Sequence, residues 1–199
     1  ESPIHAAAMQ RYFQVDLQLG LAPIASQLRG LNFDKALLLD VLEHLNHPER
    51  LLRDTLPLLR PAGGSVIVSL PNVANIFVRL NLLFGRFDYA DRGIMDRTHV
   101  RFYTRKTARE LLESNGYRIV TEHYSVIPLD RGLRLKPRGF LDRTGTSILK
   151  VLTSLFPTLF GYQLIFEAKP AAITVDSFAK TALQAMQPSV SPAPTFRST

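Results

Sequence analysis

The fold of this chain is decided by two apolar runs, FDKALLLDVLEHL (33–45) and SVIVSL (65–70). Each contains a near-continuous apolar segment of strand length, which is typical of a central strand covered on both faces. Between them a helix is predicted at 48–59, with its leucines on one side, and PAGG (61–64) ends it. This order of strand, helix and strand predicts neighbouring parallel strands.

The segments on either side continue the alternation of strands and helices. A Thr cap and a Gly stop delimit an amphipathic helix at 105–115, which follows a long polar and aromatic loop at 85–103. The alternation predicts an α/β fold, in which a mostly parallel sheet has helices on both faces and the last strand is antiparallel. The remaining elements are expected to be helices at 3–10, 73–84 and 146–155 and strands at 12–17, 117–126 and 161–168.

Composition and charge set broad limits on function. The 199 residues carry a net charge of +7 and no cysteine, which excludes disulfides, thiolate metal sites and cysteine nucleophiles. Residues 131–150 hold six basic residues and one acid, and are either a solvated loop or a patch for phosphates or an anionic membrane. Because this segment has little of the aromatic interleaving typical of nucleic-acid binding, we do not expect nucleic acid as a partner.

The chain is expected to form one domain followed by a tail. The apolar stretch 147–166 is interrupted by Lys150, Pro157 and Gly161, which favours a core helix and a strand over a membrane span. Beyond residue 170 the sequence is rich in Ala, Ser, Thr and Pro, so we expect a domain at 1–170 and a flexible tail or linker at 171–199. The lack of cysteine and of a basic-then-apolar leader predicts a cytoplasmic location.

Three blocks, in a fixed order, resemble the class I S-adenosylmethionine-dependent methyltransferase superfamily, particularly its bacterial small-molecule and sugar branch. They are FDKALLLDVLEHL (33–45), LLRPAGGSVIVSLPN (58–72) and GRFDYADRGIMDRTHVRFYTRKTARELLESNGY (85–117). The resemblance implies a Rossmann-like fold, S-adenosylmethionine as cofactor, and methylation of a hydroxyl on a small-molecule or glycan-type substrate. It covers nearly half of the chain.

The cofactor side departs from the pattern of that family. The family has a D/E-x-G-x-G-x-G loop after its first strand, and the sequence has none, so we expect a partial, N-terminally truncated domain that lacks the first strand and helix. The resemblance implies that Glu1 holds the cofactor ribose and that Asp16 faces the adenine; the alternatives are a frayed terminus and a solvated carboxylate. It also places Leu39, Asp40 and Val41 against the cofactor.

A candidate metal site follows the first central strand. Asp40, Glu43 and His44 are spaced i, i+3 and i+4, so a helical turn would put them on one side, and His99 from the long loop would join them. The set resembles the site of small-RNA 2′-O-methyltransferases, which hold a divalent ion with E-x-x-E-H and a later His; Mg²⁺ or Mn²⁺ would suit it. In the alternative interpretation no metal binds, Glu43 and His44 shape the cofactor pocket, and His99 or His44 is the general base.

Three further residues are candidates for substrate binding. Asn72 either contacts substrate or caps the next helix. Arg97 and Arg101 either bind an anionic substrate or pair with Asp91 or Asp96. We expect two adjacent strands to bring Asp40, Glu43 and Asn72 to one edge of the sheet, with His99 folded over them.

Other functions are less well supported by the sequence. An NAD-dependent dehydrogenase would need its own glycine fingerprint, which is missing. A non-catalytic, methyltransferase-like binding module agrees with the missing cofactor loop but leaves the acids and histidines unexplained. Peripheral membrane contact through 76–87 and 131–150 is a further expectation, and the sequence does not fix the oligomeric state.

Overall fold

The computed structural model describes residues 11–126 and 139–171, with the side chains of 139–146 left out. Outside the described part of the chain lie the predicted helix at 3–10, Glu1, residues 131–138 of the basic segment and residues 172–199 of the tail.

The described sheet has four strands in the order β1-β2-β4-β3. Strand β1 (Lys35–Leu39) pairs in parallel with β2 (Ser65–Pro71), and β4 (Gln163–Pro170) pairs antiparallel with both β2 and β3 (Tyr117–Tyr124). Three strands thus run in one direction and the last strand in the other. The predicted mixed α/β sheet with an antiparallel last strand is confirmed.

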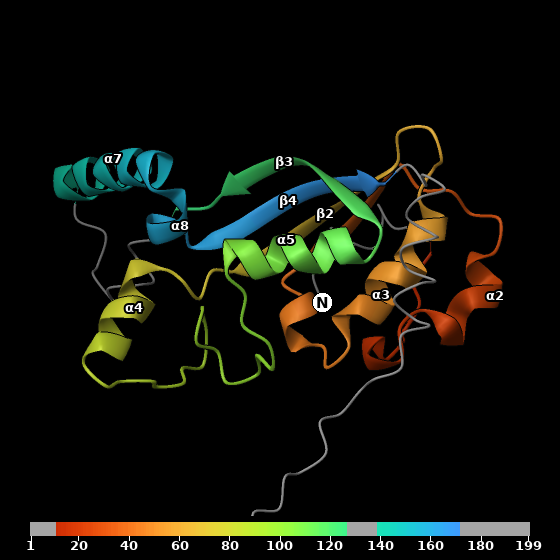
Figure 1. Cartoon of the computed structure of the whole chain (residues 1–199), viewed down its shortest axis with the longest axis horizontal. Coiled ribbons are helices and arrows are strands. Elements are labelled where there is room, and N and C mark those ends of the chain that lie inside the picture. Colours follow the sequence, from red (N-terminus) through yellow and green to blue (C-terminus); the bar gives the residue numbers. More distant parts are fainter. Residues whose placement is uncertain (1–10, 127–138, 172–199) are drawn as a thin grey trace, which may run out of the picture.

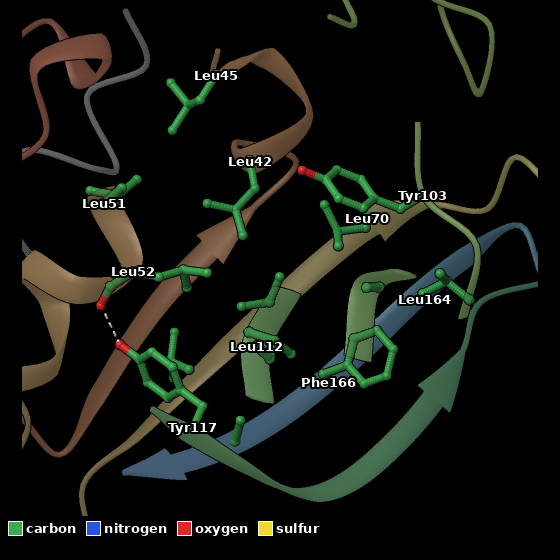
Figure 2. Close-up of a cluster of buried hydrophobic side chains, with 14 of the residues drawn as sticks. Leu42, Leu45, Leu51, Leu52, Leu70, Tyr103, Leu112, Tyr117, Leu164 and Phe166 are labelled. Carbon is green, nitrogen blue, oxygen red and sulfur yellow. Dashed lines mark hydrogen bonds between the residues drawn. The ribbon is translucent and has the colours of Figure 1, made fainter. Parts of the chain in front are cut away.

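The core lies on one face of this sheet. Alternate side chains of β2 and β4, such as Val68 and its neighbour Phe166, point to the same side and are buried. Helices α3 (Pro48–Thr55) and α5 (Arg105–Ser114) cover this face with Leu52 and Leu112 (Figures 1 and 2). Each fully buried leucine contributes about 1.5–3 kcal/mol. This packing fixes the strand ends from which the site is built.

The hydroxyl of Tyr117 links two layers of the core. It donates a hydrogen bond of 2.7 Å to the carbonyl oxygen of Leu52, so β3 is tied to α3 (Figure 2). The opposite face of the sheet differs. Leu37 and Leu39, which point there from β1, are more than half exposed, so among the described residues this face of the edge strand is poorly covered.

The segment before β1 differs from its prediction. Residues 12–16 form no strand; Asp16 instead accepts a hydrogen bond from the backbone amide of Gln18 and caps the 3₁₀-helix η1 (Leu17–Leu19). A short Asp side chain that bonds the backbone two residues ahead favours a turn over a strand, and it overrides the alternating pattern. The helices η2 (Ala22–Ile24) and α2 (Ala25–Leu28) follow.

The other helices agree with the sequence in position. The predicted helix at 48–59 is α3 continued by η4 (Leu56–Leu58), where Pro57 tightens the last turn. Helix α4 (Ile76–Leu83) lies at 73–84, α7 (Gly139–Leu155) extends the prediction at 146–155, and α8 (Pro157–Phe160) precedes β4. No helix in the described ranges is both long and apolar enough to cross a membrane.

Candidate active site at the carboxyl ends of β1 and β2

The turn after β1 begins at Asp40, which has a left-handed backbone with φ of 52°. Such a conformation costs a non-glycine residue about 1–2 kcal/mol, and Asp tolerates it better than most residues. The side chain is held from two strands: Ser69 Oγ donates to Oδ1 at 2.8 Å, and Gln163 Nε2 lies 2.8 and 2.9 Å from the two carboxylate oxygens. The edge formed by β1, β2 and β4 therefore presents a fixed carboxylate.

The next turn is the 3₁₀-helix η3 (Leu42–His44), which carries Glu43 and His44. Leu42 anchors it in the core, so Glu43 beside it is drawn inside. Gln18 holds the outer side of the turn, because its amide donates to the carbonyl of His44 and accepts from the amide of Asn46. Both functional side chains therefore sit on a short, tightly held turn.

The long loop reaches this turn through backbone hydrogen bonds. The amides of Val100 and Arg101 both donate to the carbonyl oxygen of Glu43, at 2.9 and 3.1 Å. His44 Nδ1 lies 3.1 Å from the carbonyl oxygen of Thr98. These contacts bring His99 to Glu43 across 56 positions of sequence, as expected for a loop that folds over the edge of the sheet. Parallel pairing of β1 with β2 sets the ends of both strands at this same edge.

Glu43, His44 and His99 form one cluster. Each offers a ligand atom, and these atoms all lie within 4.8 Å of one another. His99 Nε2 is 4.0 Å from Glu43 Oε1, and the two imidazole rings meet edge to face with centroids 4.8 Å apart. Groups at these distances can share one ion or one proton.

The carboxylate of Glu43 is the most unusual group in the cluster. Its residue is 1% exposed, and neither carboxylate oxygen has a hydrogen-bond partner within the described residues. Burial raises the pKa of Glu43 to about 7. The backbone amide of Glu43 itself acts in the opposite direction and lowers the pKa, whereas the nearby negative charge of Asp40 raises it. Buried carboxylates are normally hydrogen-bonded, so these two oxygens point to an external partner.

In both histidines Nδ1 is bonded to a backbone carbonyl and Nε2 is left over, which is the usual arrangement of a metal-binding imidazole. A carbonyl oxygen can only accept, so His44 Nδ1 donates to Thr98 and His99 Nδ1 donates to Ile94 at 3.0 Å. Each Nε2 then carries a lone pair, and backbone carbonyls fix ring and tautomer, as around metal-bound imidazoles. With two unpartnered carboxylate oxygens, this donor set suits a divalent ion such as Mn²⁺ or Mg²⁺.

Asp40 does not join this cluster, in contrast to the four-residue set expected from the sequence. The expected i, i+3, i+4 spacing needs a helical turn that starts at Asp40, but η3 contains only Leu42–His44. Asp40 instead turns to Ser69 and Gln163. It affects Glu43 only by its charge.

Asn72 has a structural role. It is fully buried, its amide donates to the carbonyl oxygens of Thr158 and Gly161, and its own oxygen accepts from the amide of Ala74. Its amide group thus has partners inside the protein, and contact with substrate stays a prediction. Because Asn75, not Asn72, caps α4, the alternative of a helix cap is wrong.

The two arginines of the loop have partners within the protein. Arg97 pairs with Asp91 at 2.7 Å, which is the structural alternative, and Arg101 Nε donates to the carbonyl oxygen of Asn46 at 3.0 Å rather than to a carboxylate. Both are surface side chains, so binding of an anionic substrate stays a prediction. The loop around them is held onto the turn that carries Glu43.

Four of the five predicted cofactor residues lie in the described part of the chain. Leu39 and Asp40 are exposed and Val41 is half-buried at the end of β1, where a cofactor can reach them. Asp16 is exposed as well, at the cap of η1 rather than at a strand end. Glu1 lies outside the described residues. Contact of these residues with a cofactor stays a prediction.

Tyr103 belongs to the buried core beside the site. Its hydroxyl is buried and has no hydrogen-bond partner in the described part of the chain, and burial raises its pKa to about 12. Figure 2 shows the hydroxyl directed toward the turn that carries Leu42. No sequence signal separates Tyr103 from neighbouring Phe102, because the difference arises only from the direction of the ring.

A separate hollow of about 590 Å³ lies between α2 and α3, where Leu28 and Arg53 are among its lining residues. It shares no residue with the cluster at Glu43 and holds no comparable set of donors. The chemistry of the side chains, rather than the size of a cavity, therefore places the candidate site.

A sequence-family model described as "Methyltransferase domain" matches residues 5–122, which is more than half of the chain. The chain belongs to the methyltransferase domain family. The matched part of the methyltransferase domain includes β1, β2, the turn with Glu43 and His44, and the loop with His99. No protein with a curated description matches it.

Solved structures resemble this methyltransferase domain weakly. A S-adenosylmethionine-dependent methyltransferase from Archaeoglobus fulgidus is 18% identical with a TM-score of 0.43, over 73% of this chain and 64% of its own. Magnesium protoporphyrin IX methyltransferase from Synechocystis is 15% identical with a TM-score of 0.46, over 85% of this chain and 55% of its own. Small RNA methyltransferase HEN1 is 16% identical with a TM-score of 0.41, over 75% of this chain and 15% of its own. The chain spans less than two thirds of each of these proteins.

Proposed function

We propose that this chain provides the catalytic edge of an S-adenosylmethionine-dependent methyltransferase that methylates a hydroxyl oxygen of a small-molecule or glycan-type substrate. The family supports methyl transfer, and S-adenosylmethionine supplies a methyl group bound to a positively charged sulfur. The acceptor class rests on the cluster of Glu43, His44 and His99. Two imidazoles and a carboxylate are groups that help a hydroxyl to lose its proton.

One observation carries the proposal: the buried carboxylate of Glu43, which has no hydrogen-bond partner among residues 11–126 and 147–171, faces two imidazoles that are already oriented by backbone carbonyls. The three side chains fit a divalent ion, which when bound supplies Lewis-acid chemistry that lowers the pKa of a substrate hydroxyl. Glu43, His44 and His99 would hold it. In the absence of an ion, His99 Nε2 is placed to take a proton and Glu43 to stabilise the resulting cation.

The neighbouring residues orient the reactants. Asp40 is fixed by Ser69 and Gln163 at the end of β1, and its exposed carboxylate is suited to accept hydrogen bonds from cofactor hydroxyl groups. Methyl transfer needs in-line approach of oxygen to the methyl group, so much of the rate is expected from such positioning. The hydrogen bonds between the loop and the Glu43 carbonyl hold the two sides of the site together.

Mn²⁺ binding to the purified 199-residue chain tests the metal arm, by calorimetry and by the electron paramagnetic resonance signal of the ion. His99→Ala and Glu43→Gln are each expected to weaken binding at least tenfold, because each removes one of three protein ligands. His47→Ala and Glu49→Gln are matched controls, since both residues lie just outside the turn and pair with each other at the surface. Wild-type affinity in these controls completes the expected pattern.

Transfer of a labelled methyl group from S-adenosylmethionine to hydroxyl compounds, compared with amine analogues, tests the acceptor. In a full-length protein that also carries the glycine-rich cofactor loop, the wild type is expected to label the hydroxyl compounds, and His99→Ala to lower turnover far more than the affinity for S-adenosylhomocysteine. Labelling of amines alone would contradict oxygen as the acceptor. Binding of neither Mn²⁺ nor S-adenosylhomocysteine would favour the non-catalytic module.

A further inference from the structure

Helix α4 is apolar on nearly all sides and yet lies at the surface. Within it only Val78 is buried, and Leu83 and the next residue, Phe84, are 76% and 74% exposed. We call the exposed set the α4 patch; it comprises Phe77, Leu80, Leu82, Leu83, Phe84 and Phe87. Apolar patches of this kind mark interaction surfaces, and a helix that is apolar all round is normally enclosed by protein or lipid.

The exposure of α4 contrasts with two other surface helices, α3 and α5. Helices α3 and α5 bury their apolar side, with Leu51 and Leu52 on one and Leu112 on the other, and turn arginine and glutamate outward. Helix α4 places large apolar side chains in solvent instead. Helix α7 lies toward the same end of the long axis (Figure 1) and also exposes apolar side chains, among them Val151 and Leu155.

The charges beside the patch are mostly positive. Residues 73–88 contain two arginines, Arg79 and Arg86, and one acid, Asp88. Next to the start of α4 is a cavity of about 460 Å³ whose lining includes four cations and no carboxylate. These cations are Arg79, Arg105, Lys106 and Arg109.

The cations of this cavity are partly neutralised. Arg105 and Arg109 pair with Glu122, Arg109 also pairs with Glu113 at 2.8 Å, and Lys106 is 3.8 Å from Glu110. Arg79 has no carboxylate partner in the described ranges, and its Nε donates to the carbonyl oxygen of Ala74. The cavity therefore keeps a positive character that suits phosphate groups.

We propose that α4 lies in the interface of a membrane that contains anionic lipids. The α4 patch enters the boundary of the acyl chains, and the cations of the cavity face lipid phosphates. Eight residues of helix span about 12 Å, too short to cross a bilayer but suited to lie in its interface. This inference does not depend on the proposed methyl transfer.

Two observations favour a membrane over other occupants. A second copy of this chain would bring a net charge of +7 against the same positive surface, which opposes association. Nucleic acid would satisfy the cations, and its bases could stack on the three phenylalanines, but it offers no apolar surface that would cover Leu80 and Leu83. A surface that is both anionic and apolar satisfies both features.

Co-sedimentation of the 199-residue chain with vesicles tests the proposal. Vesicles of phosphatidylcholine mixed with phosphatidylglycerol are expected to bind the chain at least tenfold better than phosphatidylcholine alone, and high salt should release it. The double variant Leu83→Ser/Phe84→Ser is expected to weaken binding at least tenfold. Because both side chains are in solvent, the variant should fold, which circular dichroism verifies.

Matched controls make the result specific. Tyr12→Ser/Leu19→Ser removes two exposed apolar side chains away from α4, and should bind as wild type. Lys106→Gln should weaken binding more than Arg118→Gln, which removes an exposed cation from β3. Equal losses in the variants and their controls would overturn the proposal.

Other outcomes identify a different occupant. Failure to bind anionic vesicles would overturn the proposal. So would a dimer in sedimentation velocity that dissociates in Leu83→Ser/Phe84→Ser, because a second copy would then cover the patch. Displacement from vesicles by inorganic phosphate at low concentration, with no effect of the apolar variant, would show a free phosphate site instead.

Discussion

Two glutamates with little exposure show opposite ways of placing a carboxylate in this fold. Glu122 of β3, with a side chain 13% exposed, accepts from Arg105 at 2.7 Å, from Tyr124 at 3.1 Å and from Arg109. Burial would raise its pKa, but these partners outweigh burial and lower it. Glu43 has no such partner, and its pKa is raised to about 7.

Ionised Glu122 therefore stabilises the folded state, whereas ionised Glu43 destabilises it. A carboxyl whose pKa rises from 4.5 to about 7 costs the folded state about 3 kcal/mol at high pH. Natural proteins tolerate such costs mainly at sites that bind or react. The pair Glu43 and Glu122 therefore provides an internal test of which residues serve function.

The sharpest test replaces each glutamate by glutamine. In chelator-treated protein at pH 8, Glu43→Gln is expected to raise the free energy of unfolding by about 1–3 kcal/mol, because it removes a buried, unpaired charge. Glu122→Gln is expected to lower it by about 1–2 kcal/mol, because two arginines lose their partner. Urea unfolding measures both, and a loss of stability in Glu43→Gln would contradict the comparison.

The pH dependence of stability sharpens the comparison. The pKa of Glu122 is lower in the folded state, so its contribution is present above its unfolded pKa and is lost as pH falls through the folded value. The pKa of Glu43 is higher in the folded state, so its cost is absent below pH 4.5 and grows as pH rises toward 7.

The measurement is urea unfolding at pH 3, 5 and 8. At pH 3 the free energy of unfolding of Glu122→Gln should be close to that of wild type. Below pH 4.5 the free energy of unfolding of Glu43→Gln should also be close to that of wild type. A constant difference from wild type at every pH would show that neither carboxyl titrates as described.

The smallest effect is expected from two tyrosines. Tyr117→Phe should lower stability by about 1 kcal/mol, because it removes the hydrogen bond to the Leu52 carbonyl. Tyr103→Phe should leave stability unchanged or raise it by less than about 1 kcal/mol, because its hydroxyl has no partner within the described residues. Equal losses in thermal unfolding would reveal a partner for Tyr103.

Periodicity and punctuation in the sequence predicted most of the fold. Strands β1 and β2, helix α5 with its Thr104 cap and Gly116 stop, and the antiparallel last strand follow from apolar runs and capping residues. The strand at 12–17 was wrong because the hydrogen bond of Asp16 to its own backbone outweighed alternation. Local side-chain bonds of this kind leave no trace in hydrophobic pattern.

The site was predicted in composition but not in detail. Glu43, His44 and His99 were chosen from residue type and spacing, and the structure brings them together. Asp40 was included on the assumption of a helical turn, and Asn72 on its place after β2; both depended on backbone geometry that spacing does not determine. The direction of Tyr103 also depends on tertiary packing alone.

The two backbone amides that bind the Glu43 carbonyl link the loop to the protonation of this residue. If Val100 and Arg101 separate from the turn, water reaches the carboxyl and its pKa falls back toward 4.5. Because a proton is then held more weakly in the open arrangement, alkaline conditions favour opening and acidic conditions favour closure. Any separation of this loop from the turn would therefore be coupled to release of a proton from Glu43.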